Sequence, residues 1–368
     1  MTFIPHAYGF QLLAPKTPLR ICEFPTPEPG ADELLVQVAG CGVCHTDAAF
    51  AFDGVPTRHP LPLILGHEIS GRVLKTGSDA GSWLGLSVIV PAVIPCGLCP
   101  ACQAGRPTIC RQQFMPGNDG NGGFATHVLV PARDLCVVPE TLPRGLTLDM
   151  LSVVADAVTT PYEAIRRSRL GSDDVAVIVG AGGVGGFGVQ IAAAMGAAVV
   201  AIDIDRERLE LASKYGAGLV LNSSSMDLKS IKAALRNFTK ESGRKGIGLK
   251  IFEMSGTPAG QITAFGLLDH GAYLAVVGFT PKAIEIRFSN LMAFDATARG
   301  NWGCPPDQYP AALQLVLEGK VALAPFIEFH ALDDAPAVLE AIAHHSIRRR
   351  VILQPKRGIR NESSETAR

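Results

Sequence analysis

The stretch from Asp173 to Asp205 constrains the fold of this 368-residue chain more than any other part of it. It starts with the apolar run VAVIV, passes into the glycine-rich segment GAGGVGGFGVQIAAAMGA, and ends with a second apolar run, AVVAIDID. A buried strand, a glycine turn that opens a helix and a second strand make a βαβ unit, from which parallel sheets are built. Strand candidates at Lys250–Met254 and Tyr273–Val277 continue the pattern. The sequence therefore predicts an α/β domain with a doubly wound parallel sheet over residues 157–295.

The glycine turn has the spacing of a dinucleotide-binding loop. It reads G-x-G-x-x-G directly after a strand and at the start of a helix, as in Rossmann folds. Glycine lets backbone N–H groups approach a pyrophosphate, whose charge also meets the positive end of the helix dipole. The residues expected at the pyrophosphate are Gly180, Gly182, Gly183, Val184 and Gly185. A glycine turn without a ligand is the alternative.

The acid that closes the second strand indicates which dinucleotide is bound. Asp203 can accept hydrogen bonds from the adenosine ribose hydroxyls and would repel a 2′-phosphate, which favours NAD over NADP. Arg206 and Arg208 lie nearby and leave NADP open, because a cation can accommodate that phosphate. We expect Arg208 to flank the adenosine and NAD to be the cofactor.

Four cysteines predict a structural metal site. The run CGLCPACQAGRPTIC holds Cys96, Cys99, Cys102 and Cys110. Short Cys-x2-Cys steps let a loop fold around one zinc ion, and four thiolates close its coordination sphere. Two disulfides or a chance crowding of cysteines are the alternatives, but no secretory segment accompanies the cluster. We therefore expect a structural zinc lobe over residues 96–110.

Length and composition limit the class of protein. A chain of 368 residues suits two domains, and 47% apolar with 18% charged residues is typical of globular proteins. The other cysteines show no disulfide-like spacing and no signal peptide opens the chain, so we expect a cytoplasmic protein. No apolar run approaches the roughly 20 residues of a membrane span. A net charge of -1 gives no general attraction for nucleic acid. A small molecule is the expected partner.

The region before the parallel sheet has a different character. Residues 1–156 are rich in proline and glycine, with short apolar runs at Leu34–Val38, Leu86–Val90 and Thr126–Val130. These features predict a β-rich domain. After the parallel sheet the chain is expected to return to this domain over residues 296–368, which end in a polar tail.

A second group of metal-binding residue types lies outside the cysteine lobe, in GCGVCHTD and LGHEISG. Cys44 and His67 offer a thiolate and an imidazole, which leave a zinc ion short of ligands, and an open sphere is what Lewis-acid catalysis needs. With the cysteine lobe and the glycine turn, these segments resemble the zinc-dependent medium-chain alcohol dehydrogenases in the same order along the chain. The resemblance covers nearly the whole sequence. It implies a GroES-like catalytic domain, a Rossmann domain and an active site between them.

The resemblance also implies the ligands of a catalytic zinc. Cys44 and His67 are two of them, Glu68 is an adjacent carboxylate that approaches the metal during ligand exchange, and Asp47 accepts the spare ring N–H of His67. The family's Cys-x5-Tyr segment matches DAVTTPY here, so Asp156 stands where cysteine is commonest. A carboxylate is an acceptable zinc ligand, and its harder oxygen should leave the ion more electrophilic. A solvated loop acid is the alternative for Asp156.

Proton transfer is assigned in the same way. Thr46 matches a serine or threonine whose hydroxyl bonds to the substrate alcohol and starts a proton path through the nicotinamide ribose. Many relatives end this path at a histidine, but the matching residue here is Ala49, so the proton exit stays open. His59 and His127 are the unassigned histidines of the same domain. The resemblance places the remaining cofactor contacts at His45 and Arg349 or Arg350 for the pyrophosphate, and at Thr160, Gly278 and the segment near Asn301 for the nicotinamide.

The implied activity is a zinc- and NAD-dependent oxidation of a secondary alcohol to a ketone by hydride transfer, in a homodimer or homotetramer. Within the family the chain most resembles the 6-hydroxycyclohex-1-ene-1-carbonyl-CoA dehydrogenases of anaerobic aromatic degradation. By chain location, Arg58, Arg287 and Arg299 are candidates for the CoA phosphates. The loop at 114–123 either approaches a ligand or crosses the surface flexibly. The alternatives are a general alcohol, polyol or benzyl alcohol dehydrogenase, an NADH-dependent conjugate (enoyl) reductase, and a non-catalytic zinc- and NAD-binding protein.

Overall fold

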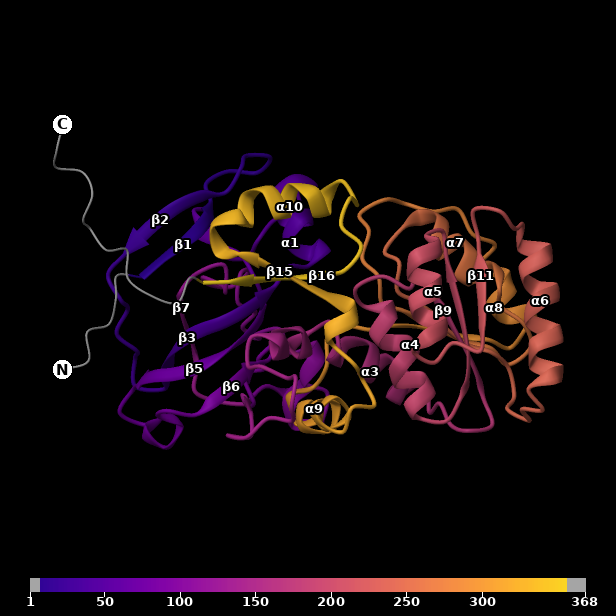
Figure 1. Cartoon of the computed structure of the whole chain (residues 1–368), viewed down its shortest axis with the longest axis horizontal. Helices are drawn as coiled ribbons and strands as arrows, with labels where there is room; N and C mark the ends of the chain where they lie inside the picture. The colour runs from indigo at the N-terminus through magenta and orange to yellow at the C-terminus, as the bar shows by residue number, and fades with distance from the viewer. Residues whose placement is uncertain (1–6, 356–368) are drawn as a thin grey trace.

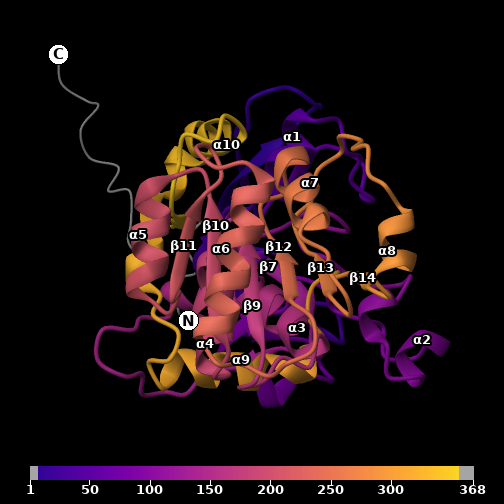
Figure 2. The same ribbon diagram turned by 90° about the vertical axis from the view of Figure 1, so that its right-hand side faces the viewer.

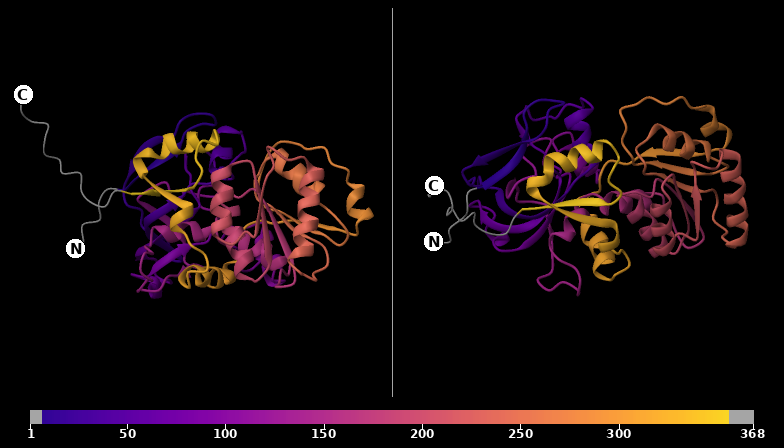
Figure 3. Two further views of the ribbon diagram at one scale, coloured as in Figure 1. Left: turned by 45° about the vertical axis from the view of Figure 1, so that its right-hand side comes forward. Right: turned by 45° about the horizontal axis from the view of Figure 1, so that its top comes forward.

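The computed structural model describes residues 7–355 and arranges them as two domains that lie side by side (Figure 1). The first and last parts of the chain share one domain, and the middle part forms the other (Figures 1 and 3). Within residues 7–355 no helix combines the length and the apolar character that crossing a membrane requires.

The first domain is built on a seven-stranded, mainly antiparallel sheet and a three-stranded sheet. The large sheet has the order β15-β16-β3-β5-β6-β8, and β7 also pairs with β3. The small sheet has the order β2-β1-β4. The strands are β1 (Ala7–Leu12), β2 (Arg20–Phe24), β3 (Glu33–Gly42), β4 (Leu63–Ile64), β5 (Glu68–Thr76), β6 (Ser87–Val90), β7 (His127–Pro131), β8 (Cys136–Val137), β15 (Ile327–Ala331) and β16 (Arg350–Gln354).

The predicted β-rich character of this domain is confirmed. Its apolar runs became strands because neighbouring strands flank them: Leu34–Val36 in β3 are fully buried and pair with both β5 and β7. The last strand, β16, pairs with the end of β3 at Cys41 and Gly42, so the C-terminal part of the chain completes the sheet. The helix α10 (Ala335–Ala343) then packs along α1 (His45–Phe52) over the same domain (Figure 1).

The second domain has a six-stranded, all-parallel sheet of order β11-β10-β9-β12-β13-β14, which Figure 2 shows from β11 on its left to β14 on its right. This is the doubly wound Rossmann order, with the first three strands reversed relative to the last three, as predicted. Its strands are β9 (Val175–Val179), β10 (Ala198–Asp203), β11 (Leu219–Asn222), β12 (Lys250–Glu253), β13 (Tyr273–Val276) and β14 (Thr297–Gly300). Its helices are α4 (Gly185–Ala194), α5 (Arg206–Lys214), α6 (Leu228–Glu241), α7 (Pro258–Gly266) and α8 (Ser289–Ala293).

Strand β9 is apolar at every position because helices cover both faces of the sheet. Val175 and Val177 belong to the core shared with α6 and α7, whereas Ala176 and Ile178 belong to the core shared with α4 and α5. The alternation of side chains along a strand accounts for this division.

The sheet extends beyond the boundary predicted at residue 295. Strand β14 pairs in parallel with β13 from Thr297 to Gly300. All four of its residues are exposed, and their sequence, TARG, lacks the apolar pattern of a buried strand. Backbone pairing with β13 therefore forms this edge strand, and the return to the first domain begins after it.

A continuous apolar core joins the two domains. It contains Ile89 and Val138 of the first domain, Phe187 of α4, and Phe326, whose ring lies 5.6 Å from that of Phe187. The connecting elements are the 3-10 helix η3 (Met150–Ala155) and α3 (Thr159–Arg167). The other short elements are η1 (Gly81–Trp83), α2 (Pro100–Gln103), η2 (Pro107–Ile109), η4 (Pro306–Gln308), α9 (Tyr309–Leu317), η5 (Ala324–Phe326) and η6 (Leu332–Asp334).

Tyr309, at the start of α9, ties three segments of this junction together. Its side chain is fully buried, and its hydroxyl donates to the Ala155 carbonyl at 2.5 Å and accepts from the Ala92 N–H at 3.1 Å. Ala155 directly precedes Asp156, so this hydroxyl supports the backbone next to a predicted zinc ligand.

We expect Tyr309→Phe to lower the free energy of unfolding by about 1–3 kcal/mol, because it leaves a buried N–H and a buried carbonyl without this partner. Urea denaturation of the zinc-loaded protein measures the change. Tyr215→Phe is the matched control: Tyr215 packs its ring against Phe326, and no hydrogen bond of its hydroxyl is found within residues 7–355. Equal stability of the two variants would contradict the role given to the Tyr309 hydroxyl.

Candidate active site and metal centres

The four predicted cage cysteines converge in a lobe around α2. The Cys99 Sγ lies 3.5 Å from the Cys102 Sγ and 3.7 Å from the Cys110 Sγ, and the Cys96 Sγ lies 4.0 Å from that of Cys102. A disulfide bond would require about 2.0 Å. Four thiolates at about 2.3 Å from a tetrahedral zinc ion stand about 3.8 Å apart, so the cysteines fit a structural zinc ion.

The backbone of the lobe favours the thiolate form of its first cysteine. N–H groups of Leu98 and Cys99 lower the pKa of Cys96 to about 6. The Cys96 N–H donates to the Cys110 Sγ at 3.4 Å. Because zinc binds the thiolate, these hydrogen bonds prepare the lobe for the metal. In Figure 2 the lobe around α2 lies at the lower right, away from the parallel sheet.

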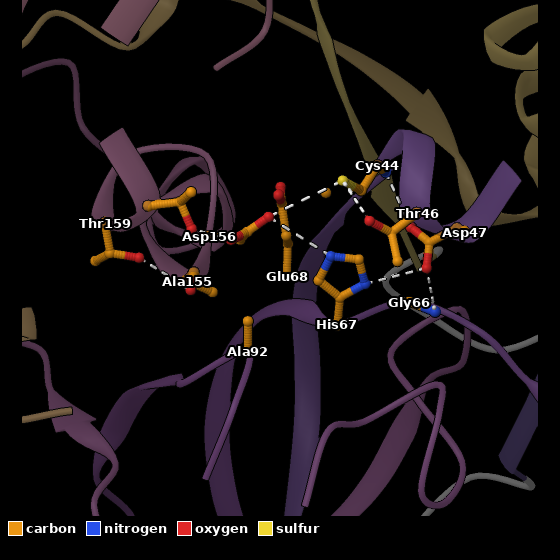
Figure 4. A network of polar contacts seen from close by, with 12 residues as sticks. Cys44, Thr46, Asp47, Gly66, His67, Glu68, Ala92, Ala155, Asp156 and Thr159 are labelled. Carbon is orange, nitrogen blue, oxygen red and sulfur yellow. Dashed lines mark hydrogen bonds and ion pairs between the residues drawn. The ribbon is translucent and has the colours of Figure 1, made fainter. Parts of the chain in front are cut away.

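The second group also assembles, from three parts of the fold. Cys44 precedes α1, His67 directly precedes β5, whose first residue is Glu68, and Asp156 follows η3. One ligand atom of each lies within 4.8 Å of the others, and Figure 4 shows the four side chains pointing toward a common centre. The segments are distant in sequence, and the antiparallel pairing of β3 with β5 is what brings Gly42 beside Glu68.

Asp47 holds two of these side chains in place. It is fully buried, and its carboxylate accepts hydrogen bonds from the Cys44 N–H at 2.9 Å, the Gly66 N–H at 3.2 Å and His67 Nδ1 at 3.1 Å (Figure 4). Since a carboxylate only accepts, Nδ1 carries a proton, and Nε2 is the ring nitrogen that would bind a metal, which would displace any proton there. This is the contact that the sequence predicted for Asp47.

Asp156 presents one defined oxygen to the cluster. The Thr160 hydroxyl donates to its Oδ1, which leaves Oδ2 facing His67 Nε2 at 3.6 Å and the Cys44 Sγ at 3.9 Å. Tetrahedral zinc ligands would stand about 3.4 Å apart for nitrogen and oxygen, and about 3.6 Å apart for sulfur and oxygen. The donor set and its spacing therefore fit a zinc ion with three protein ligands.

The charges of the cluster also favour a cation. Burial raises the pKa of Asp156, but the hydrogen bond and charge of His67, with Arg350 and Thr160, outweigh it and bring the pKa down to about 2. Burial lowers the pKa of His67, yet Asp47 and Asp156 outweigh that effect and raise it well above its usual value. The acids thus attract positive charge to the point where a metal ion would lie.

Glu68 has a partner that sequence reasoning did not identify. Arg350 Nε donates to Glu68 Oε2 at 3.0 Å, its Nη2 bonds to Oε1, and that Nη2 lies 3.9 Å from Asp156 Oδ2. Burial raises the pKa of Glu68 to about 7, although the Arg350 charge and hydrogen bonds lower it. A separation of 282 residues leaves no local signal for this pair.

The glycine turn lies next to this cluster. Gly180 has a φ of +92°, and a Cβ there would come within 2.6 Å of the Ser255 backbone. A Cβ on Gly185 would lie 1.7 Å from the Gly180 carbonyl oxygen. Val184 precedes α4, and the Arg350 side chain packs against Gly183, where a Cβ would be 3.4 Å from Arg350 Cδ. Arg350 therefore bridges the turn and the metal cluster.

Asp203 ends β10 and faces the same turn. Its Oδ2 accepts from the Ala181 N–H at 2.7 Å and its Oδ1 from the Asp205 N–H at 2.9 Å. The Arg208 guanidinium lies beside Gly182, where a Cβ would be 3.4 Å from its Nη1, and its Nη2 donates to the Ile347 carbonyl. Both side chains thus lie at the turn.

Basic groups gather at the mouth of the turn. His45 Nε2 lies 3.2 Å from His345 Nδ1, and the two rings stack with centroids 5.1 Å apart. Sequence reasoning missed His345, which comes from the end of α10, because only the packing of α10 on α1 brings it there. Arg349 is exposed, whereas Arg350 is buried, so of the two predicted arginines only Arg350 reaches the cluster.

The residues expected at the nicotinamide lie at the carboxyl end of the parallel sheet, and one of them, Thr160, has a further role. Thr160 orients Asp156, as described above, and its carbonyl accepts from Asn301 Nδ2 at 3.3 Å. Gly278 follows β13 at the carboxyl edge of the sheet, where its N–H donates to the Glu253 carbonyl and a Cβ would lie 2.2 Å from the Gly256 nitrogen. These residues surround the carboxyl ends of the central strands, where ligands bind in such sheets.

The structure also bears on the 114–123 loop and on the two unassigned histidines. Gly117 and Gly122 of the 114–123 loop pack on backbone: a Cβ on Gly122 would lie 2.2 Å from the Gly66 carbonyl oxygen, so the loop supports the turn before His67. His59 bonds to the Pro60 carbonyl and His127 to Thr126, and neither contacts Thr46 among the residues described.

The three arginines considered for CoA lie on different domains of the described chain. Arg58 pairs with Asp119 at 3.2 Å in the first domain. Arg287 and Arg299 belong to the second domain, where Arg299 lies exposed on β14.

Comparisons with known proteins agree with this architecture. Residues 30–140 match the family described as alcohol dehydrogenase GroES-like domain, and residues 183–318 match zinc-binding dehydrogenase. An alcohol dehydrogenase of Rhizobium meliloti (strain 1021) is 30% identical over 342 residues, covering 91% of this chain and 95% of that protein.

Solved structures resemble the fold over nearly its full length. The crystal structure of galactitol-1-phosphate dehydrogenase from Escherichia coli has a TM-score of 0.84 at 26% identity, covering 95% of this chain and all of that one. A zinc-binding dehydrogenase from Sinorhizobium meliloti 1021, bound to NADP, has a TM-score of 0.82 at 25% identity, covering 96% of this chain and all of that one. With its two zinc-fitting donor sets and its GroES-like and Rossmann domains, the chain belongs to the zinc-dependent medium-chain alcohol dehydrogenase family.

Proposed function

We propose that this protein is a zinc- and NAD-dependent dehydrogenase that oxidises a secondary alcohol to a ketone. The convergence of Cys44, His67 and Asp156 beside the glycine turn supports the proposal most directly. Bound zinc would act as a Lewis acid toward the substrate oxygen, and bound nicotinamide would take up the hydride. The remaining steps are carried by side chains of the protein itself.

Thr46 is the group proposed to handle the substrate proton. Its hydroxyl lies 3.7 Å from the Cys44 Sγ and is half-buried at the start of α1. A hydroxyl both donates and accepts, so it can take a proton from the alcohol while passing its own onward. Ala49 is buried and offers no group to continue the path, so the cofactor ribose or solvent would receive the proton.

The cofactor preference is proposed from Asp203. Its carboxylate stands at the end of β10, where the adenosine ribose would lie, and negative charge there disfavours a 2′-phosphate. Arg208 is the opposing influence, since its Nε is buried without a hydrogen-bond partner within residues 7–355. We propose NAD on the strength of the acid.

The substrate class is proposed from the relatives and from the sequence. The relatives are named for alcohols and for a polyol phosphate, which supports a secondary alcohol or polyol. The resemblance to 6-hydroxycyclohex-1-ene-1-carbonyl-CoA dehydrogenases makes a cyclic hydroxyacyl-CoA the narrower proposal. The arginines that are candidates for the CoA phosphates lie on two domains.

Metal analysis with an activity assay tests the whole proposal. Wild type should contain two zinc ions per chain, one for each donor set, whereas Asp156→Ala should retain one and lose NAD-dependent oxidation because a zinc ligand is gone. Asp53→Ala, an exposed acid that caps the other end of α1, should keep both ions and full activity. The assay covers simple secondary alcohols, polyols and a cyclic hydroxyacyl-CoA beside its truncated thioester.

Several outcomes would change the proposal. One zinc ion in both wild type and Asp156→Ala would reject the catalytic site, leaving a binding role. Reduction of a conjugated double bond under NADH, without alcohol oxidation, would make the enzyme an enoyl reductase. Equal kcat/KM for the CoA ester and the truncated thioester would reject CoA recognition.

The Thr46 hydroxyl is tested by removing it and restoring it. We expect Thr46→Ala to lower kcat by about 10²-fold or more, the usual contribution of a positioned proton-transfer group. Thr46→Ser keeps the hydroxyl and should stay near wild type, and both variants should retain two zinc ions. A Thr46→Ala enzyme with unchanged kcat would remove this residue from the proton path.

Asp203→Asn tests the cofactor preference. The amide oxygen can still accept a backbone hydrogen bond, but the negative charge is lost, so the ratio of kcat/KM for NADP to that for NAD should rise by about tenfold. Asp205→Asn removes a charge two residues away while preserving a helix cap, and should leave the ratio unchanged. If both variants shift the ratio equally, the shift comes from the loss of one negative charge in this region and not from the position of Asp203.

A further inference from the structure

A large cavity lies at the end of the parallel sheet where the strands begin, opposite the end that carries the glycine turn. It has a volume of about 790 Å³, within the range of roughly 300–1,000 Å³ that is usual for small-molecule sites. Its wall includes Val175, the first residue of β9, and Leu249, which directly precedes β12. The length of β9, about 15 Å, therefore separates this cavity from the cofactor turn. Its helical wall, α6, lies on the side of the molecule away from the first domain (Figures 1 and 2).

Positive charge is concentrated on one wall. Lys232, Arg236 and Lys240 follow one another at intervals of four residues on α6, so they share a face of the helix, and Arg244 lies on the following turn. None of the four forms a direct ion pair within residues 7–355, although the Lys232 charge helps to lower the pKa of Asp269. Arg244 donates from Nη1 to the Ser172 carbonyl, and its Nε is buried without a hydrogen-bond partner among these residues. Arg236 and Lys240 are exposed, and the four cations outnumber the single acid of the lining, so this wall carries a net positive charge that would attract an anion.

The rest of the lining is mostly apolar. Leu235, Leu267 and Leu268 are buried residues of the domain core that also line the cavity. Phe294 packs against the same core and lines the cavity too, with its ring 5.4 Å from that of His270. Asp269 is the acid of the lining, and its carboxylate is already bonded to the backbone and ring of His270. The cavity thus combines a basic wall with apolar, partly aromatic lining residues.

We propose that this cavity is a second ligand site, which binds a phosphorylated small molecule with a flat apolar body, of the size of a nucleotide. The phosphates would contact the α6 cations through charge-assisted hydrogen bonds, and the flat body would lie against Phe294 and the leucines. This site is separate from the cofactor and zinc sites, so a ligand there would bind together with the dinucleotide.

The test uses ATP as the probe on the zinc-loaded enzyme with NADH at saturation, so that the cofactor turn is filled. Calorimetry should detect ATP binding, and inorganic triphosphate or adenosine alone should bind more weakly than ATP. Arg236→Glu with Lys240→Glu should raise the Kd for ATP by about tenfold or more, because two phosphate contacts become repulsive.

The control is a charge reversal of equal size outside the cavity. Lys229→Glu with Lys214→Glu places the same charges at exposed positions of α6 and α5 that do not line the cavity, and should leave the Kd within about twofold. Melting temperatures identify any unfolded variant, in which case Arg236→Gln with Lys240→Gln replaces the charge reversal. Absence of ATP binding to the NADH-saturated enzyme, or an equal loss of affinity in both pairs, would overturn the proposal.

Discussion

The geometry of the metal cluster depends on the buried carboxylate of Asp47. A carboxylate removed from water must have its acceptor sites filled, and here the Cys44 and Gly66 N–H groups and the His67 ring fill them. These donors come from two segments about 20 residues apart, so one side chain holds the start of α1 against the turn before β5. The same contact leaves His67 Nε2 free on the side of the cluster. Both first-domain ligands therefore owe their positions to a residue that binds no metal.

A second buried acid, Glu68, is paired with the part of the chain that returns to the first domain. Glu68 is wholly buried, and a lone charge there would be costly, since a charge without a partner in an apolar interior loses its hydration without compensation. Arg350 supplies the partner, at the start of the strand β16 that completes the main sheet. The same side chain packs on Gly183. One arginine thus couples the sheet of the first domain, the acids beside the metal position and the nucleotide turn of the second domain.

The Rossmann turn and the cysteine lobe could be predicted from local sequence, because each pattern reflects interactions between residues that are close along the chain. The run VAVIV and the glycines after it specify a buried strand and a turn that only glycine can adopt, as the positive φ of Gly180 shows. The spacing of Cys96, Cys99 and Cys102 lets one loop enclose one ion. Strand β14 was missed for the same reason: its exposed residues carry no apolar pattern, and its pairing with β13 alone makes it a strand.

Local patterns along the chain specify its parts: a β-rich domain, a Rossmann sheet with its dinucleotide turn, a cysteine lobe and the residue types of a catalytic zinc site. Tertiary structure alone decided how those parts meet. It paired Arg350 with Glu68, brought His345 to His45, turned Thr160 toward Asp156, and set the cations of α6 around a cavity. These contacts join residues or elements whose mutual position depends on the packing of helices and sheets. Such packing follows from burial summed over the whole core, which no local pattern records.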